Sequence, residues 1–344
     1  MVRKVLVIKL GTAVITNKEG TIDSNIVRKL AGEVALLREA YNIIIVSSGA
    51  VGSGKKFLNN YKGSLSERKA AAAVGNPLLI QLYHQHFKKH GITVAQALCE
   101  RVHFSNRPQF LQLKQTFATF WENDIIPVVN ENDLVSNVEI KFSDNDELAT
   151  LLAIGFDSPA LILCTSTGGL LDHGNNIIPK IEKLDASVLK YVTTRKSTSG
   201  LGGMLSKLTF TRLANSLGID VIICGLKGEN PLNAALLGNN GSYFYGRGSN
   251  LRARQKWLAS GSITLGTIHI DKGAARALAA RKSLLTVGIT EAAGKFSAGE
   301  VIQVMDEEEN ILGVAKTRIG AQEIMKRLKE KNVVAAHADD IVLF

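Results

Sequence analysis

The chain of 344 residues has few cysteines and no long hydrophobic run. Its three cysteines, Cys99, Cys164 and Cys224, are too scattered to predict a disulfide framework or a zinc site. The longest apolar runs, such as residues 43–46, fall far short of the ~18 residues that a membrane-spanning helix needs. The first residues lead straight into a strand-like segment without the features of a signal peptide. We therefore expect a cytoplasmic protein that does not insert into a membrane.

Histidine is scarce as well, and none of the seven histidines has the spacing of a metal ligand. His84, His86 and His90 fall at positions i, i+2 and i+6 of one expected helix, which does not place them on one face. The sequence therefore predicts no metal site made of protein side chains.

The chain carries a net charge of +10 at pH 7, but this surplus is confined to part of its length. Residues 261–344 contain 11 Lys+Arg and 11 Asp+Glu, so the whole surplus lies before them. A basic surface, or the binding of anionic phosphate substrates, explains it as well as nucleic-acid binding does. Charge alone therefore decides nothing about the partner.

The first 258 residues alternate short β-branched segments with longer amphipathic ones. The continuous apolar character of residues 43–46 and 221–223 is typical of central parallel strands that are covered on both faces. This alternation predicts an α/β fold, a three-layer αβα sandwich with a mainly parallel central sheet, whose ligands lie beyond the carboxyl ends of the strands. We expect strands at 4–10, 42–47, 93–98, 125–130, 160–165 and 220–224, and helices near 24–40, 67–90, 107–122, 146–155 and 204–217.

The character of the sequence changes after about residue 258. Residues 259–262 (Ala-Ser-Gly-Ser) resemble a linker, and the remainder contains no proline and many short strand-like runs. This pattern predicts a small, mostly β, barrel-like second domain. The expected domain boundaries are 1–258 and 266–344.

Two lysines follow or precede glycine turns in a way that suits phosphate binding. Lys9 lies at the carboxyl end of the first expected strand, in the sequence Lys9-Leu10-Gly11-Thr12, and Lys207 lies in the first turn of a helix after the glycines of residues 200–203. Backbone amides and an ammonium group can converge on a phosphate in such turns. The second loop lacks the residue order of a Walker A loop. The alternative to phosphate binding is a purely structural role, in which Lys9 is an ordinary lysine at a strand end and the glycines of residues 200–203 form a flexible turn before a helix.

Three polar clusters lie between these lysines, at residues 47–52, 130–133 and 143–146. Turn formation or helix N-capping explains some of these residues. In the functional interpretation, Asp146 positions both lysines electrostatically while Asn145 contacts a substrate. Because phosphoryl transfer mainly requires positioning and charge neutralisation, the combination predicts a phosphoryl-transfer site.

In this order, the segments resemble the amino-acid kinase family, and in particular its members that phosphorylate glutamate and carry an appended PUA domain. The resemblance extends from about residue 4 to the C-terminus. It rests on the motifs Val-Ile-Lys-Leu-Gly-Thr (7–12), Ser-Ser-Gly-Ala-Val (47–51), Ala-Ala-Val-Gly (72–75), Pro-Val-Val-Asn-Glu-Asn-Asp (127–133), Asp-Asn-Asp-Glu-Leu (144–148) and Gly-Gly-Met (202–204) through Lys207.

The resemblance implies an enzyme that transfers a phosphoryl group from MgATP to the γ-carboxylate of L-glutamate, forming the labile L-glutamyl 5-phosphate of proline biosynthesis. Its cofactors would be ATP and Mg²⁺, with the ion held mainly by the nucleotide phosphates. By matching position, the catalytic residues would be Lys9, Asp146 and Lys207, and the glutamate-binding residues Ser48, Gly49, Asp133 and Asn145. The ATP-binding residues would be Lys9, Gly11, Thr165, Ser166, Leu201, Gly202, Gly203, Met204, Leu205, Ser206 and Lys207.

The chain departs from the family pattern at several positions. Ser166 stands where the family has an Asp, Leu201 where it has a Thr, and Asn76 where it has a Gln. The change at Ser166 predicts weaker nucleotide binding. The three charged residues of the proposed catalytic set are intact, which favours an active enzyme.

The resemblance also implies a homo-oligomer, either a dimer or a tetramer, and feedback inhibition by proline. RNA binding by the PUA-like domain is not predicted, because this domain has no net charge and no arginine-aromatic stripe. Two alternatives remain open. The protein could be a sibling kinase acting on a different carboxylate or phosphate acceptor, or a decayed kinase that serves as a regulatory or RNA-binding module.

Overall fold

The computed structural model describes residues 3–17, 19–135, 144–182, 184, 188, 191, 202–246 and 266–343. The chain forms two compact units, one of residues 1–100 and 111–249 and the other of residues 101–110 and 250–344. None of the helices described in these ranges is long and apolar enough to cross a membrane.

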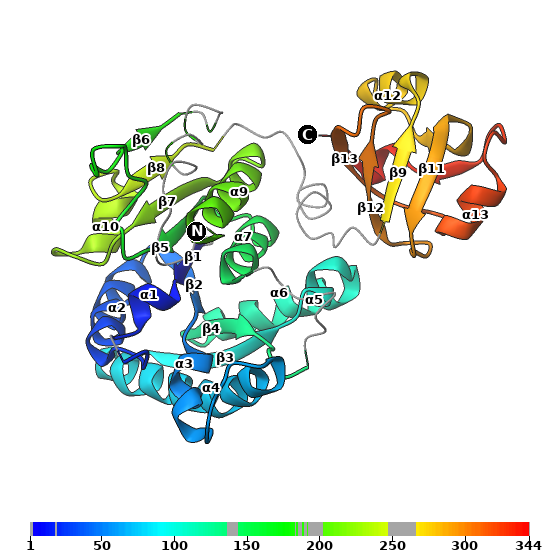
Figure 1. Cartoon of the computed structure of the whole chain (residues 1–344). Coiled ribbons are helices and arrows are strands. Elements are labelled where there is room, and N and C mark those ends of the chain that lie inside the picture. Colours follow the sequence, from blue (N-terminus) through cyan, green and yellow to red (C-terminus); the bar gives the residue numbers. More distant parts are fainter. Residues whose placement is uncertain are drawn as a thin grey trace. The chain divides into compact units, whose positions relative to one another are not determined.

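The first unit is built on one eight-stranded sheet. Its strands are β1 (Lys4–Leu10), β2 (Tyr41–Ser47), β3 (Thr93–Cys99), β4 (Ile125–Glu131), β5 (Ala160–Cys164), β6 (Lys180–Ile181), β7 (Asp220–Cys224) and β8 (Ser242–Phe244). They are arranged in the order β3-β4-β2-β1-β5-β7-β8-β6 (Figure 1). Every neighbouring pair is parallel except β7 with β8. The mainly parallel sheet predicted from the apolar runs is confirmed.

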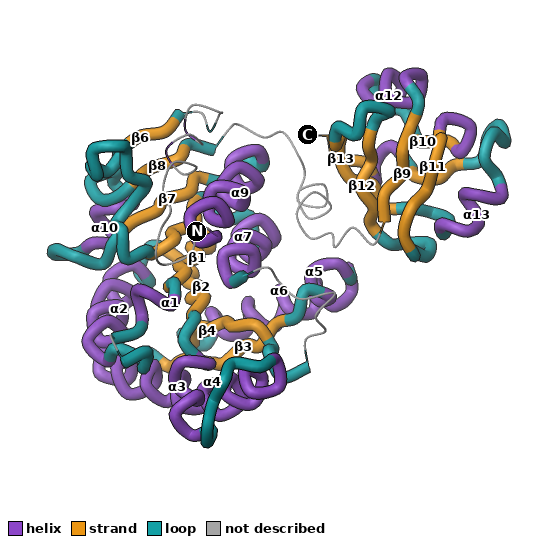
Figure 2. The backbone as a smooth tube through the Cα atoms, in the orientation of Figure 1, coloured by secondary structure: helices purple, strands orange, loops and turns teal. Residues whose placement is uncertain are grey.

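Helices cover both faces of this sheet, as the tube view shows (Figure 2). On one face, α2 (Ser24–Leu37), α4 (Leu65–Phe87) and α10 (Pro231–Leu236) share a hydrophobic core with the strands. On the other face, α7 (Asn145–Gly155) packs on β1, β2, β4 and β5, and α9 (Gly202–Ser216) packs on β7. The predicted three-layer αβα sandwich is therefore confirmed. The first unit also contains the short helices α1 (Thr12–Ile15) and α3 (Ala50–Gly54). Residues 101–110, which are grouped with the second unit, contain α5 (Val102–Ser105) and the beginning of α6 (Arg107–Glu122), most of which belongs to the first unit.

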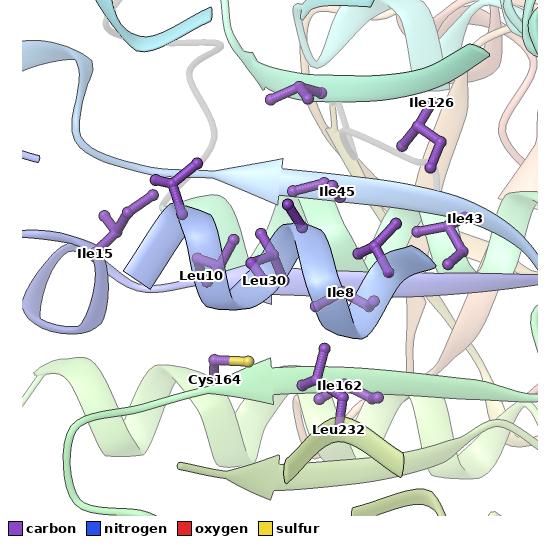
Figure 3. Packing of buried hydrophobic residues seen from close by; sticks show 14 of the residues in the cluster. Ile8, Leu10, Ile15, Leu30, Ile43, Ile45, Ile126, Ile162, Cys164 and Leu232 are labelled. Carbon is purple, nitrogen blue, oxygen red and sulfur yellow. The ribbon is translucent and has the colours of Figure 1, made fainter. Parts of the chain in front are cut away.

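The first core shows why the central strands are so apolar. Ile8 and Leu10 of β1 point to the same face, because alternate residues of a strand share a face, and they pack with Leu30 of α2 (Figure 3). Ile45 of β2 and Ile162 of β5 extend this layer to the neighbouring strands. Residues of β1 between these positions face α7, so the strand is buried on both sides up to its carboxyl end.

The second unit has its own sheets and its own core. A five-stranded sheet has the order β11-β9-β12-β13-β15, and a two-stranded sheet pairs β10 with β14. The predicted small, mostly β domain is confirmed, whereas the boundaries 1–258 and 266–344 stay a prediction because residues 247–265 lie outside the described chain. Its elements are β9 (Gly266–Ile270), α12 (Lys272–Ala279), β10 (Leu284–Leu285), β11 (Ile289–Gly294), β12 (Val301–Met305), β13 (Ile311–Lys316), α13 (Ala321–Lys326), β14 (Val334–Ala336) and β15 (Ile341–Leu343).

Candidate active site

The carboxyl ends of the central parallel strands bring the predicted site residues to one edge of the sheet. Lys9 lies one residue before the end of β1, in register with Val46 of β2 and Leu163 of β5. Ser48 directly follows β2, and Thr165 directly follows β5. Since parallel strands end at the same edge, residues that are 39 positions (Lys9 and Ser48) and 156 positions (Lys9 and Thr165) apart in the sequence come to the same edge here.

Asp146 holds two ammonium groups at this edge. One carboxylate oxygen, Oδ1, lies 2.5 Å from Lys9 Nζ, and the other, Oδ2, accepts a hydrogen bond from Lys207 Nζ at 2.8 Å. Asp146 and Lys9 are almost fully buried, at 1% and 4% exposure, and Lys207 is half-buried. The arrangement carries a net charge of +1 in a region of low dielectric, which suits the binding of an anion.

The pKa of Asp146 is lowered from its ordinary value by this arrangement. Burial is the largest single influence and acts to raise the pKa, because it disfavours the charged carboxylate. The charges of Lys9 and Lys207, together with the hydrogen bonds that these lysines donate, act in the opposite direction and prevail. Asp146 is therefore a carboxylate at neutral pH, and it is suited to positioning cations rather than to donating a proton.

The beginning of α7 is fixed by Asp144, which caps the helix. Its Oδ1 accepts hydrogen bonds from the backbone N–H groups of Asp146, at 2.9 Å, and Glu147, at 3.1 Å. Its Oδ2 accepts a hydrogen bond from Ser206 Oγ at 2.5 Å. Ser206 and Lys207 are consecutive residues of α9, so this bond ties α9 to α7 beside the ion pairs of Asp146. Capping and site geometry thus depend on the same carboxylate.

Asn145 turns to the other side of the site and joins a network of uncharged groups. Its Nδ2 donates to Ser48 Oγ at 3.1 Å and to Asn130 Oδ1 at 3.0 Å. Asn130 in turn donates to Asn76 Oδ1 at 3.2 Å, so the network continues into α4. The hydroxyl of Tyr83 in α4 donates to Ser47 Oγ at 2.9 Å, and this hydrogen bond links the last residue of β2 to α4.

A cavity of about 300 Å³ opens beside this network. All four predicted substrate-binding residues line it, namely Ser48, Gly49, Asp133 and Asn145. Gly49 has a φ of +108°, and a Cβ at this position would lie 2.3 Å from Ile22 Cδ1, so the turn requires glycine. Arg68 of α4 also lines the cavity and was not foreseen from the sequence.

The predicted nucleotide-binding residues lie on the β5, β7 and α9 side of Lys9. Gly11 lies beside Lys9, since a Cβ on Gly11 would lie 3.6 Å from Lys9 Nζ. The backbone N–H of Thr165 donates to the carbonyl of Cys224 at 2.8 Å, while Ser166 is exposed. Gly202, Gly203, Met204, Leu205 and Ser206 form the first turns of α9 with Lys207, whereas Leu201 lies outside the described residues.

The described residues contain no group of three or more His, Cys, Asp or Glu side chains that could hold a metal ion. Two carboxylates of α7 and its cap have partners in the protein, because Asp146 binds both ammonium groups and Asp144 caps α7 and accepts a hydrogen bond from Ser206.

Comparison with known proteins assigns the chain to a family. The model of the amino acid kinase family matches residues 4–225, and that of the PUA domain matches residues 266–338. Since the first match covers more than half of the chain, the protein belongs to the amino acid kinase family. A solved carbamate kinase from Giardia shares this fold, with a TM-score of 0.50 and 17% identity over 72% of this chain and 100% of that one.

The chain is also similar over nearly its whole length to several glutamate 5-kinases. The glutamate 5-kinase of Aquifex aeolicus is 36% identical over 98% of this chain and 99% of its own length. That of Kosmotoga olearia is 34% identical over 93% of this chain and 90% of its own. That of Streptococcus pneumoniae is 33% identical over 98% of this chain and 95% of its own.

Proposed function

We propose that this protein is a kinase that transfers the γ-phosphoryl group of ATP to the γ-carboxylate of L-glutamate. The product is L-glutamyl 5-phosphate, and the reaction is the first step of proline biosynthesis. The observation that carries the proposal is the buried carboxylate of Asp146, which holds two ammonium groups next to a polar cavity. The glutamate 5-kinases that match over nearly the full length support the choice of acceptor.

The acceptor needs no general base. A side-chain carboxylate has an ordinary pKa of about 4.3, so it is already deprotonated at neutral pH. One of its oxygens forms a bond to the γ-phosphorus while the bond from that phosphorus to the bridging oxygen breaks, and ADP leaves with the electron pair. No proton has to move in this step.

The main difficulty is electrostatic, because a negative carboxylate must approach a negative phosphate. Lys9 and Lys207 reduce this repulsion and neutralise the charge that spreads over the phosphoryl oxygens during transfer. Asp146 contributes by holding both ammonium groups in place before the substrates bind, so that they need little reorganisation. We assign the catalytic roles to Lys9, Asp146 and Lys207 on this basis.

The cavity provides the place for the amino-acid end of glutamate. Ser48 and Asn145 offer a hydroxyl and an amide at the side nearest the ion pairs, and Asp133 offers a carboxylate for the α-ammonium group. Gly49 contributes backbone to the cavity wall, where glutamate could approach it. These four residues make up the proposed glutamate-binding set.

ATP would bind on the side of Lys9 that faces away from the glutamate cavity. Its contacts there would be Gly11, Thr165, Ser166, Leu201 and the first turns of α9. Mg²⁺ would be bound mainly by the nucleotide phosphates, in keeping with its reluctance to lose water and with the engaged carboxylates of the site. The ion would supply further neutralisation of the phosphate charge.

The proposal includes a cytoplasmic, homo-oligomeric enzyme, either a dimer or a tetramer, that responds to proline. ATP is a cytoplasmic substrate, which supports the location. Proline carries the same α-carboxylate and α-nitrogen pattern as glutamate, so it is chemically able to compete for the cavity. No RNA-binding role of the PUA domain is part of the proposal.

Trapping of the acyl phosphate tests the proposal. Hydroxylamine converts glutamyl phosphate to a stable hydroxamate, and we expect this product with L-glutamate and MgATP. N-acetylglutamate and aspartate serve as competing acceptors in parallel reactions. Faster hydroxamate formation with either of them would assign the protein to a sibling activity, and no product with any acceptor would support a decayed kinase.

A further inference from the structure

The cavity beside the ion pairs contains a cation that the proposed glutamate-binding set does not use. Of the described residues that line it, Arg68 is the only lysine or arginine, and Glu131 and Asp133 are among its carboxylates. Arg68 is exposed, and its guanidinium forms no ion pair or hydrogen bond with another described residue. Its five N–H donors are thus available to a ligand.

The beginning of α4 fixes the position of Arg68. Ser64 caps the helix and forms a reciprocal capping box with Glu67, whose carboxylate is engaged in that bond. The backbone N–H of Arg68 donates to the carbonyl of Ser64 at 2.9 Å, so Arg68 is part of the first hydrogen-bonded turn. The neighbouring Glu67 therefore does not neutralise it, and the helix register at this point is well defined.

The packing of α4 against α3 orients the face of α4 that contains Arg68 toward the cavity. Positions 68, 71, 72 and 75 share one helical face, and Ala71, Ala72 and Gly75 are buried. A Cβ on Gly75 would lie 1.8 Å from the carbonyl oxygen of Ala50, and one on Gly54 would lie 1.9 Å from that of Ala71. The backbones of α3 and α4 are therefore in direct contact. Arg68 lies on the same face of α4 as these contacts, and it lines the cavity together with residues 50–52 of α3.

The charges around the cavity match those of an α-amino dicarboxylate. The γ-carboxylate must lie near Lys9 and Lys207 to accept a phosphoryl group, and Asp133 places a carboxylate in the cavity lining that can face the α-ammonium group. The α-carboxylate is then the remaining charge of the substrate, and Arg68 is the remaining cation of the cavity. A guanidinium binds a carboxylate in a planar, bidentate arrangement that is stronger than a neutral hydrogen bond.

We propose that Arg68 binds the α-carboxylate of the acceptor and thereby determines the preference for a free α-amino acid over analogues without that charge. The assignment rests on the proposed glutamate kinase function and adds a specificity-determining residue to it. Loss of a hydrogen-bonded charge at such a position weakens binding of the matching substrate and leaves an analogue without the group largely unaffected.

Calorimetric titration with two ligands tests this assignment. L-Glutamate carries the α-carboxylate, whereas its α-amide, L-isoglutamine, replaces it with a neutral group and keeps the γ-carboxylate. For Arg68→Gln we expect the Kd of L-glutamate to rise roughly ten- to a hundredfold, while the Kd of isoglutamine stays within about threefold. Arg68→Lys should restore part of the discrimination, since it keeps the charge and loses the planar fork.

Arg28→Gln provides the matched control, because Arg28 is an exposed arginine of α2 that does not line the cavity. Equal weakening of both ligands by Arg68→Gln, or no weakening of either, would overturn the assignment while leaving the proposed function in place. If the wild-type protein forms no hydroxamate from L-glutamate, the proposed function fails, and the role of Arg68 fails with it. Hydroxamate formation by the wild type therefore separates the two outcomes.

Discussion

Two consecutive residues at the start of α7 serve two different halves of the site. Asp146 binds the ammonium groups of Lys9 and Lys207 in a buried, charged cluster. Asn145 joins Ser48 and Asn130 in an uncharged hydrogen-bond network beside the cavity. The two halves therefore differ in charge although one helix turn positions both.

This difference indicates a division of labour. In the proposed function, the charged half would interact most strongly with the negative charge that develops during transfer, so its loss should mainly lower kcat. The uncharged half would contact substrate groups that do not change during the reaction, so its loss should mainly raise KM. Variants of each half can therefore be distinguished by whether kcat or KM changes.

The largest expected effect follows from Asp146→Asn. Its removal leaves the buried ammonium of Lys9 without a counter-charge, which typically costs roughly 3–5 kcal/mol of folding free energy. Because the pKa of Asp146 is lowered in the folded state, the stabilisation is present above the unfolded pKa of about 4 and is lost as the pH falls through the lower folded value. Urea denaturation of both proteins from pH 3 to 8 measures the difference.

We expect that difference in free energy of unfolding to be constant between about pH 5 and 8 and to shrink below about pH 4. Comparing the two proteins at each pH removes the contribution of the other carboxylates. A difference that grows on acidification would show that Asp146 is not an ionised partner of the two lysines.

Lys9→Ala should have the next largest effect. Loss of one group that stabilises the transferring phosphoryl typically costs ~3–4 kcal/mol, or a factor of roughly 100 to 1,000 in kcat. Lys9→Arg should not restore the rate, because a planar fork replaces a compact point charge. Lys4→Ala, at the exposed beginning of the same strand, is the control. A folded Lys9→Ala variant with kcat within a few-fold of the wild type would contradict the charged half of the account.

Asn145→Ala tests the uncharged half. It removes the hydrogen bonds to Ser48 and Asn130 together with the proposed contact to glutamate, for an expected loss of roughly 1–3 kcal/mol that is expressed mainly in the KM for glutamate. Steady-state kinetics at varied glutamate gives both parameters. Asn123→Ala, at the end of α6, serves as the control. A fall in kcat at an unchanged KM would assign Asn145 to the charged half instead.

The smallest effect concerns Ser166, which lies on the proposed nucleotide side at the position where the resemblance leads us to expect an Asp. Ser166→Asp should lower the KM for ATP by a factor that corresponds to about 1–2 kcal/mol, with kcat nearly constant. The reason is that the added contact would stabilise bound nucleotide equally in the ground state and in the transition state. Initial rates at varied ATP and GTP measure the change. An unchanged or raised KM for ATP would indicate that the pocket around Ser166 has been rebuilt for serine.

Much of the fold could be predicted because its signals are long and regular. Parallel central strands are buried on both faces, so residues 43–46 and 221–223 are continuous apolar runs that are easily recognised. The short helices α1 and α3 were not foreseen, since four or five residues carry no helical period. The antiparallel strand β8 has three residues, too few to show its direction.

The site could be predicted in part for a similar reason. Lys9, Asp146 and Lys207 lie in motifs, and the structure brings these three side chains together. Arg68 could not be recognised, because a charged residue in the first turn of a helix ordinarily belongs to a solvated surface. The sequence shows Asn76 only as a departure from the family pattern, because the buried hydrogen bond that it accepts from Asn130 depends on packing between α4 and β4.

The most direct test of the division of labour is the single-turnover rate of acyl phosphate formation at saturating L-glutamate and MgATP. Saturation removes differences in substrate binding, so only stabilisation of the transfer itself remains. The account predicts that Lys207→Ala lowers this rate roughly 100- to 1,000-fold, whereas Asn145→Ala stays within about tenfold of the wild type. Equal losses in the two variants, or a larger loss in Asn145→Ala, would contradict it.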